Sequence, residues 1–295
     1  MSENDTEEER MRTAVVTDSN SGITREKADR YGIFMLPMPF YIDDELYLEG
    51  ETLSHVDFFT MQQSGARIYT SQPSPANVMD LWDRVLEEYD ELLYIPMSSG
   101  LSGSCQTAQA LAQDYDGKVV VADMGRVSVA QKHAVLEAVK RANAGMSARD
   151  ICKELVYYRN EFQIYITVET LDYLKAGGRV SASSAMIGNL LNIRPILSLN
   201  TGQVEVAGKA KGEKLSRKKM IHAIEEDLIG RFHASNLDDF YLAAAASMSK
   251  EKAAEWKQQL EDHFGIHCNM SPIPLSVATH LGYGTHGVAV MRKMK

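Results

Sequence analysis

The sequence has few cysteines, no long apolar run and no excess of basic residues. Its three cysteines, Cys105, Cys152 and Cys268, lie far apart and form no C-x-x-C pair. A disulfide framework or a zinc site is therefore not expected, and a reducing cytoplasm is the expected compartment. No apolar stretch approaches the roughly 20 residues that a membrane-spanning helix needs. The formal net charge of -9 argues against general binding to nucleic acids or anionic membranes, which both favour basic surfaces.

The length and the order of apolar segments predict two α/β domains. The chain has 295 residues, of which 44% are hydrophobic, enough for two substantial cores. Residues 1–11 are polar and acidic and lack the pattern of a signal peptide, so we predict a disordered tail. In residues 12–160, strand-like runs such as TAVVTDS (13–19) and LLYIP (92–96) alternate with helical patterns. This alternation predicts an N-terminal domain with a largely parallel sheet flanked by helices.

The remaining residues, 161–295, predict a C-terminal α/β domain with a mixed sheet. IRPILSL and QVEVAG flank the turn NTG and predict a hairpin. A strand, a helix and a strand follow between residues 238 and 272, and the chain ends in a glycine-rich loop, HLGYGTHG, that enters a last strand. We expect His280 and His286 to lie in this loop.

Two loops are crowded with hydroxyl groups. YTSQPSP occupies 69–75, and SSGLSGS occupies 98–104, between a predicted strand and a helix. Uncharged hydroxyls at the carboxyl end of a parallel strand, next to a helix N-terminus, can surround a carboxylate or a phosphate. Serine and proline are also ordinary turn residues, so the composition alone leaves a plain structural role open.

Known catalytic motifs are missing from these loops. The second loop lacks G-K-[ST], G-x-G-x-x-G and G-x-S-x-G, and no H-E-x-x-H pattern exists, so no metal site is predicted. Arg179 follows a glycine pair in LKAGGRV, where a functional or a structural role is open. The basic segment 209–219 is either a solvated loop or a contact for a phosphate-carrying partner.

The order of several motifs resembles the DegV family from about residue 12 to the end of the chain. These motifs are VTDSNSG, TSQPSP, SSGLSGS-Q, LDYLKAGGR, NIRPIL and the terminal H-x-G-x-G. The resemblance implies two α/β domains with a long-chain fatty acid in a tunnel between them. Several members act as the fatty-acid-binding subunit of bacterial fatty acid kinase and present the acyl carboxylate to a separate ATP-using subunit, which makes acyl phosphate for phospholipid synthesis. It thus implies a lipid-binding subunit that is not itself an enzyme, needs no cofactor besides the fatty acid, and makes at most transient membrane contact.

The resemblance also assigns site residues. Thr70 and Ser102 match the family's carboxylate-contacting hydroxyls, and Ser71 and Ser99 are their neighbours. The supporting residues are Arg179, His280 and Arg194, the last standing where the family usually has lysine. Two departures are Tyr283 and the extra His286 in the terminal loop, and NSG at 20–22 in place of a more usual T-S-D.

Two other functions remain open from the sequence. The protein could be an enzyme that uses the serine-rich loop for phosphoryl transfer to a small molecule, or for ester hydrolysis with Ser102 as the nucleophile. It could also be a regulatory lipid sensor with the same pocket and no kinase partner.

Overall fold

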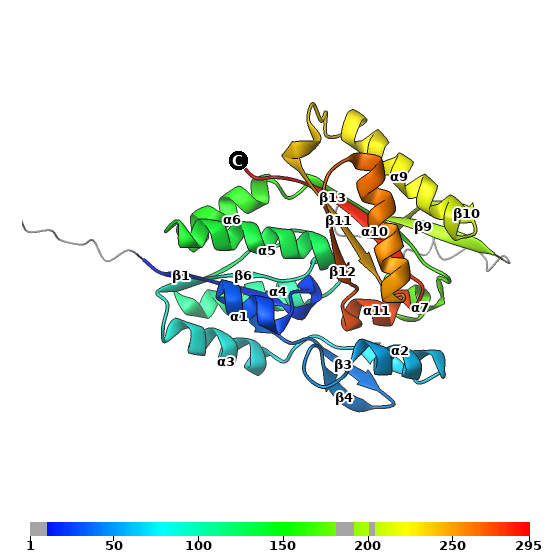
Figure 1. Cartoon of the computed structure of the whole chain (residues 1–295). Coiled ribbons are helices and arrows are strands. Elements are labelled where there is room, and N and C mark those ends of the chain that lie inside the picture. The colour runs from blue at the N-terminus through cyan, green and yellow to red at the C-terminus, as the bar shows by residue number, and fades with distance from the viewer. Residues whose placement is uncertain (1–10, 181–191, 201–203) are drawn as a thin grey trace, which may run out of the picture.

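A parallel sheet of four strands organises most of the first half of the protein, with helices packed against it (Figure 1). The computed structural model describes residues 11–180, 192–200 and 204–295. The strand order is β2-β1-β6-β7, with every neighbouring pair parallel. The strands are β1 (Thr13–Asp18), β2 (Ile33–Leu36), β6 (Glu91–Ile95) and β7 (Val119–Val121). All residues of β1 and β6 are buried, which explains why both read as continuous apolar runs.

Helices cover both faces of this sheet. Val15, Leu93 and Ile95 pack with α1, α5 and α6, whereas Val16, Leu92 and Tyr94 pack with α3 and α4. The helices are α1 (Arg25–Tyr31), α3 (Pro75–Leu86), α4 (Ser104–Leu111), α5 (Ser128–Asn143) and α6 (Ala148–Tyr157), with the short 3-10 helices η1 (Ser19–Ser21) and η2 (Ala112–Tyr115) between them. Thr24, Ser74 and Ser147 each accept a hydrogen bond from the backbone N–H three residues on and so cap the N-termini of α1, α3 and α6.

A small antiparallel sheet lies beside the parallel sheet. Its order is β4-β3-β5, with β3 (Pro39–Ile42), β4 (Glu45–Leu48) and β5 (Ile68–Thr70). Asp43 and Asp44 have positive φ angles and make the predicted hairpin turn between β3 and β4. The strand β5 was not predicted, and it places Thr70 at the end of a strand. Helix α2 (His55–Gln63) connects β4 to β5.

The second half contains a six-stranded mixed sheet of order β10-β9-β8-β13-β11-β12, in which only β11 and β12 run parallel. Its strands are β8 (Phe162–Thr167), β9 (Ile193–Leu199), β10 (Val204–Lys211), β11 (Phe240–Ala246), β12 (Cys268–Pro272) and β13 (His286–Arg292). Helices α9 (Glu213–Gly230) and α10 (Lys250–Phe264) cover one face, and η3 (Leu237–Asp239) precedes β11. The predicted hairpin of β9 and β10 is confirmed.

The other face of the mixed sheet packs against the first half. Helices α7 (Asp172–Ala176) and α11 (Leu275–Leu281) lie there, and α11 lies between the mixed sheet and the small antiparallel sheet (Figure 1). The shared core joins Phe40 and Phe58 to Ile164, Ala245 and Leu281. The domain boundary at residues 160 and 161 stays a prediction. Residues 1–10 of the predicted tail, 181–191, and most of the NTG turn lie outside the described residues.

Candidate functional site

A cavity of about 260 Å³ opens between segments from both halves of the chain. Five of the predicted site residues line it, and we call these five the polar cluster: Thr70, Ser71, Ser102, Arg179 and His280. Much of the remaining lining is apolar, namely Met38, Met97, Leu101, Val127, Ile166, Leu174, Leu199, Val204, Val277 and Leu281. The cavity therefore combines hydrogen-bond donors with an extended apolar wall.

A second, smaller cavity of about 40 Å³ lies against the apolar wall. The two cavities share Val127, Ile166, Val277 and Leu281, and no member of the polar cluster lines the smaller one. Ala245 and Gly287, neighbours in the sheet, supply small residues to its lining. Because nearly all of its lining is apolar, this smaller cavity offers no partners for water and suits the end of a hydrocarbon chain.

Four different segments bring the polar cluster together. Thr70 and Ser71 come from the end of β5, and Ser102 from the loop between β6 and α4, at the carboxyl edge of the parallel sheet. This edge is where the sequence places an anion site. Arg179 follows α7. Gly177 makes room for the cluster, since a Cβ atom there would lie 2.1 Å from Nδ1 of His280.

The position of His280 differs from the expectation. The sequence predicts a loop from residue 280 onward, but His280 lies in the last turn of α11 and His286 begins β13. The glycine-rich loop is confined to the residues between them. It starts at Gly282, whose φ of 78° favours glycine and whose missing side chain leaves room for the ring of Tyr173. Tyr283 packs its ring against Phe59 of α2, with 5.4 Å between the ring centroids.

His280 is neutral near pH 7. Burial, with the positive charge of Arg179 as a second cause, lowers the pKa of His280 to about 4. Its Nε2 lies 3.0 Å from Oγ1 of Thr70. In the tautomer with a proton on Nε2, the ring donates to Thr70, which leaves the Thr70 hydroxyl proton to donate to a ligand.

Arg179 supplies positive charge without a carboxylate partner among the described residues. Its guanidinium donates to the carbonyl oxygens of Leu101, at 3.3 Å, and Gly177, at 2.5 Å. Leu101 precedes Ser102, so these bonds tie the segment after α7 to the serine loop. Within the described ranges no acidic side chain forms an ion pair with Arg179, so its charge is available to an anion in the cavity.

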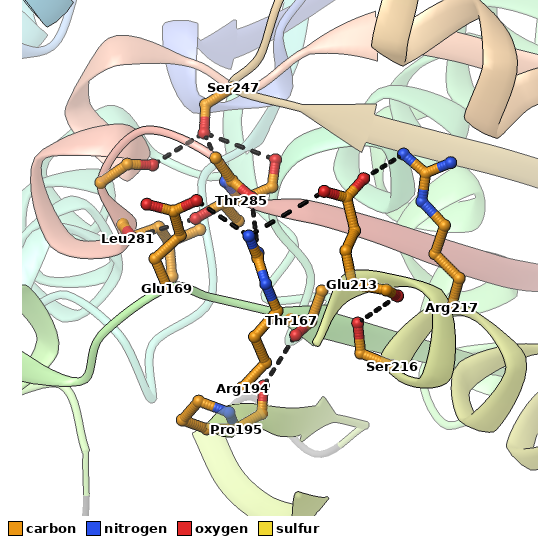
Figure 2. Close-up of polar contacts among 12 residues, drawn as sticks. Thr167, Glu169, Arg194, Pro195, Glu213, Ser216, Arg217, Ser247, Leu281 and Thr285 are labelled. Carbon is orange, nitrogen blue, oxygen red and sulfur yellow. Dashed lines mark hydrogen bonds and ion pairs between the residues drawn. The ribbon is translucent and has the colours of Figure 1, made fainter. Parts of the chain in front are cut away.

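Two predicted residues do not line the cavity. Ser99 donates to Oδ2 of Asp123 at 2.6 Å, which directs its hydroxyl to the neighbouring loop. Arg194 donates to Glu169 at 2.8 Å and to the carbonyl of Gly284 at 3.3 Å, and lies 3.9 Å from Glu213 (Figure 2). Glu213 also accepts from Arg217 at 2.5 Å. We call this group, Glu169, Arg194, Glu213 and Arg217, the Arg194 cluster.

Sequence reasoning missed three polar residues of the cavity wall, which are Asn20, Gln72 and Ser276. Asn20 and Ser276 are 256 residues apart and are joined by a hydrogen bond of 2.6 Å. Asn20 belongs to the NSG departure, which was the only signal for it in the sequence.

In the described parts of the chain, no group of three or more His, Cys, Asp or Glu residues could hold a metal ion. No helix there is long and apolar enough to cross a membrane.

The family of this chain follows from comparison with known proteins. The DegV family model, described as "Uncharacterised protein, DegV family", matches residues 12–293. A DegV domain-containing protein of Deinococcus radiodurans is 33% identical over 286 residues, which cover 95% of this chain and 98% of that protein. The chain belongs to the DegV family, as the motifs indicate.

Solved structures confirm the fold class. A DegV family protein from Thermus thermophilus, described for its fatty acid binding, has a TM-score of 0.87 and 30% identity, covering 96% of this chain and all of that one. DegV from Bacillus subtilis, described as a fatty acid binding protein, has a TM-score of 0.83 and 27% identity, with coverage of 96% and 100%. The α/β fold, with a parallel sheet and a separate mixed sheet, is therefore shown.

Proposed function

We propose that this protein binds a long-chain fatty acid in the cavity and presents its carboxylate to a separate ATP-dependent kinase subunit, which forms the acyl phosphate. The main support for the proposal is that a single cavity is lined both by the polar cluster and by a long series of apolar side chains. Two similar proteins, from Thermus thermophilus and Bacillus subtilis, are described as binding fatty acids.

The hydrocarbon tail supplies most of the affinity in this proposal. Burying about 14 methylenes at about 0.8 kcal/mol each gives roughly 11 kcal/mol as an upper figure. The polar cluster orients the carboxylate, and each hydrogen bond that it makes to the charged group adds about 1.5–3 kcal/mol. The side chains of Val127, Ile166, Val277 and Leu281 line both cavities, so the end of the tail would extend toward the smaller one between them.

The polar cluster suits a carboxylate that must still react. Thr70 and Ser102 would each donate one hydrogen bond, while Arg179 keeps two of its donors on the carbonyls of Leu101 and Gly177. A bidentate arginine would occupy both carboxylate oxygens. With hydroxyl donors, one oxygen keeps a lone pair for attack on the terminal phosphorus of ATP. That oxygen gains the phosphoryl group and ADP leaves, so the bound fatty acid becomes the acyl phosphate.

Lipid extraction tests the binding step. Purified protein, denatured and extracted, should release about one long-chain fatty acid per chain by mass spectrometry. A chain that carries no fatty acid and fails to bind added palmitate would contradict the proposal. An enzymatic function with Ser102 as the nucleophile is less well supported, because within the described residues no hydrogen bond joins Ser102 to a histidine, and His280 contacts Thr70. Ester hydrolysis by the isolated chain would revive it.

A Ser102→Ala variant tests the presentation step. In an assay reconstituted with a fatty acid kinase subunit and ATP, we expect acyl phosphate formation to fall by at least about tenfold, because a hydrogen bond to a charged group is worth about 1.5–3 kcal/mol. Ser104→Ala is the matched control: Ser104 is two residues away, does not line the cavity, and its buried hydroxyl has no partner among the described residues. Unchanged turnover in Ser102→Ala would remove Ser102 from the proposed role.

A further inference from the structure

Glu49 is a buried carboxyl group at the start of α11, the helix that carries Val277 and His280 into the cavity wall. It directly follows β4 and is only 7% exposed. Its Oε1 accepts a hydrogen bond from the backbone N–H of Leu275, and its Oε2 accepts from the Ser19 hydroxyl at 3.0 Å and from the N–H of Ser276 at 3.4 Å. Glu49 therefore caps the N-terminus of α11 from a segment 226 residues away in the chain.

The contacts of the Ser276 hydroxyl require one more proton than serine has. Its Oγ lies 2.6 Å from Oδ1 of Asn20 and 2.5 Å from Oε2 of Glu49. A hydroxyl has one proton and can donate to only one of these oxygens. The amide of Asn20 is oriented by its own donation to Asp18, at 3.1 Å, so its oxygen faces Ser276. A proton on Glu49 satisfies both contacts, because Glu49 then donates to Ser276 while Ser276 donates to Asn20.

The surroundings of Glu49 favour this proton. Burial raises the pKa of Glu49 to about 7, although its hydrogen bonds to Ser276, Leu275 and Ser19 act in the opposite direction. The charged or titratable residues that line a groove together with Glu49 are Arg25, Asp29, Glu51, His55, Arg84 and Glu88.

None of the nearby cations neutralises Glu49 within the described ranges. Arg25 lies 3.8 Å from Glu51 instead. His55 is held by the carbonyl of Ile273, and burial lowers the pKa of its ring. The other side-chain partner of Asn20 is Asp18, which is also a buried carboxyl group and therefore cannot neutralise Glu49.

We propose that Glu49 is a positioning residue for the cavity, and that its proton sets the bridge from α11 through Ser276 to Asn20. The inference rests on the proposed fatty-acid function, because Asn20 and Ser276 both line the cavity. When Glu49 loses its proton, the cap on α11 remains, but the Ser276 proton turns to the carboxylate. Asn20 then faces a lone pair and the bridge between η1 and α11 is lost. We expect the bridged form to bind fatty acid more tightly, because the bridge holds the start of α11, which carries Val277 and His280 into the cavity wall. Binding and protonation of Glu49 then favour each other.

A Glu49→Gln variant tests this by keeping the bridge at every pH. With its amide nitrogen in the place of Oε2, the glutamine can donate to Ser276 as the protonated acid does, and its amide oxygen keeps the hydrogen bond from the N–H of Leu275. By isothermal titration calorimetry with palmitate, we expect the affinity of the natural protein to fall about tenfold between about pH 6 and pH 8.5, within the limit of one released proton. The affinity of Glu49→Gln should change by no more than about twofold over the same pH range. Both comparisons are made after subtracting the change in affinity that comes from the titration of palmitate itself, which is the same for the two proteins.

Two further variants keep the test decisive. Ser276→Ala removes the bridge itself, so its affinity at pH 6 should already equal that of the natural protein at pH 8.5. Glu51→Gln is the matched control, because Glu51 lines the same groove, is exposed and pairs with Arg25, and it should keep the natural pH profile. Identical pH profiles in the natural protein and Glu49→Gln would overturn the role of Glu49. Absence of palmitate binding in all variants at every pH would instead overturn the proposed function.

Discussion

The polar cluster and the Arg194 cluster place similar residues in opposite electrostatic settings. Each cluster contains an arginine close to a glycine-containing turn. In both clusters this arginine comes from the second half of the chain. Arg194 has Glu169 at 2.8 Å and Glu213 at 3.9 Å. Arg179 donates to backbone carbonyls, and no carboxylate of the described residues pairs with it. Only the polar cluster therefore leaves its positive charge for a ligand.

This difference shows that residue type does not by itself predict an anion site. A ligand carboxylate at the Arg194 cluster would have to displace a protein carboxylate that already accepts from the guanidinium. At the polar cluster a carboxylate meets hydroxyls and a neutral histidine, which have no negative charge to repel it. The protein's own carboxylates thus determine which arginine can serve a fatty acid.

The most severe test of the comparison places a carboxylate in the polar cluster. We expect Ser102→Asp to weaken palmitate binding by at least about 100-fold, because two carboxylates about 4 Å apart repel by several kcal/mol even at an effective dielectric constant of 20. Ser102→Asn, of similar size and uncharged, should bind within about tenfold of the natural protein. Isothermal titration calorimetry compares the two variants. Equal affinities would contradict the view that the polar cluster binds a carboxylate because it contains no carboxylate of its own.

A smaller effect is expected when one hydroxyl donor is removed. Thr70→Val keeps the shape of the side chain and should lower palmitate affinity by about tenfold to 100-fold, the range for a hydrogen bond to a charged group. Ser99→Ala should leave affinity within about twofold, because the Ser99 hydroxyl donates to Asp123. A fluorescence displacement assay with both variants checks this pair. A larger loss in Ser99→Ala than in Thr70→Val would reverse the assignment of the two hydroxyls.

The sequence predicts the elements whose signal is local. Continuous apolar runs predict β1 and β6, and the capping serine Ser54 predicts the start of α2, where it accepts from the backbone of Asp57. The three-residue strand β5 has no such signal, because its pairing with β3 depends on residues about 30 positions away. The sequence predicts a loop at His280, in the last turn of α11, because Gly282 and Gly284 dominate this segment, although both follow the helix.

The site is predictable in part for the same reason. The family motifs lead to Thr70 and Ser102, whereas the composition of the serine-rich loop does not separate Ser102 from its neighbour Ser99. Only the folded backbone directs Ser99 to Asp123 and Ser102 to the cavity. Glu49 carries no local pattern at all. Its role depends on a helix that begins 226 residues later, so only the three-dimensional structure brings them together.

The smallest effect is expected from replacing the arginine of the Arg194 cluster, which should change stability and leave ligand binding unaffected. Arg194→Gln should reduce the free energy of unfolding by about 0.5–1 kcal/mol, the range for partly exposed ion pairs, because Glu169 loses its partner while Glu213 keeps Arg217. Urea denaturation measures this loss, and Arg194→Lys, which keeps the charge, should lose less. Palmitate affinity should stay within about twofold in both variants. A tenfold drop in palmitate affinity with unchanged stability would instead place Arg194 in the ligand site. The Arg194 cluster would then bind ligand as well as stabilise the fold.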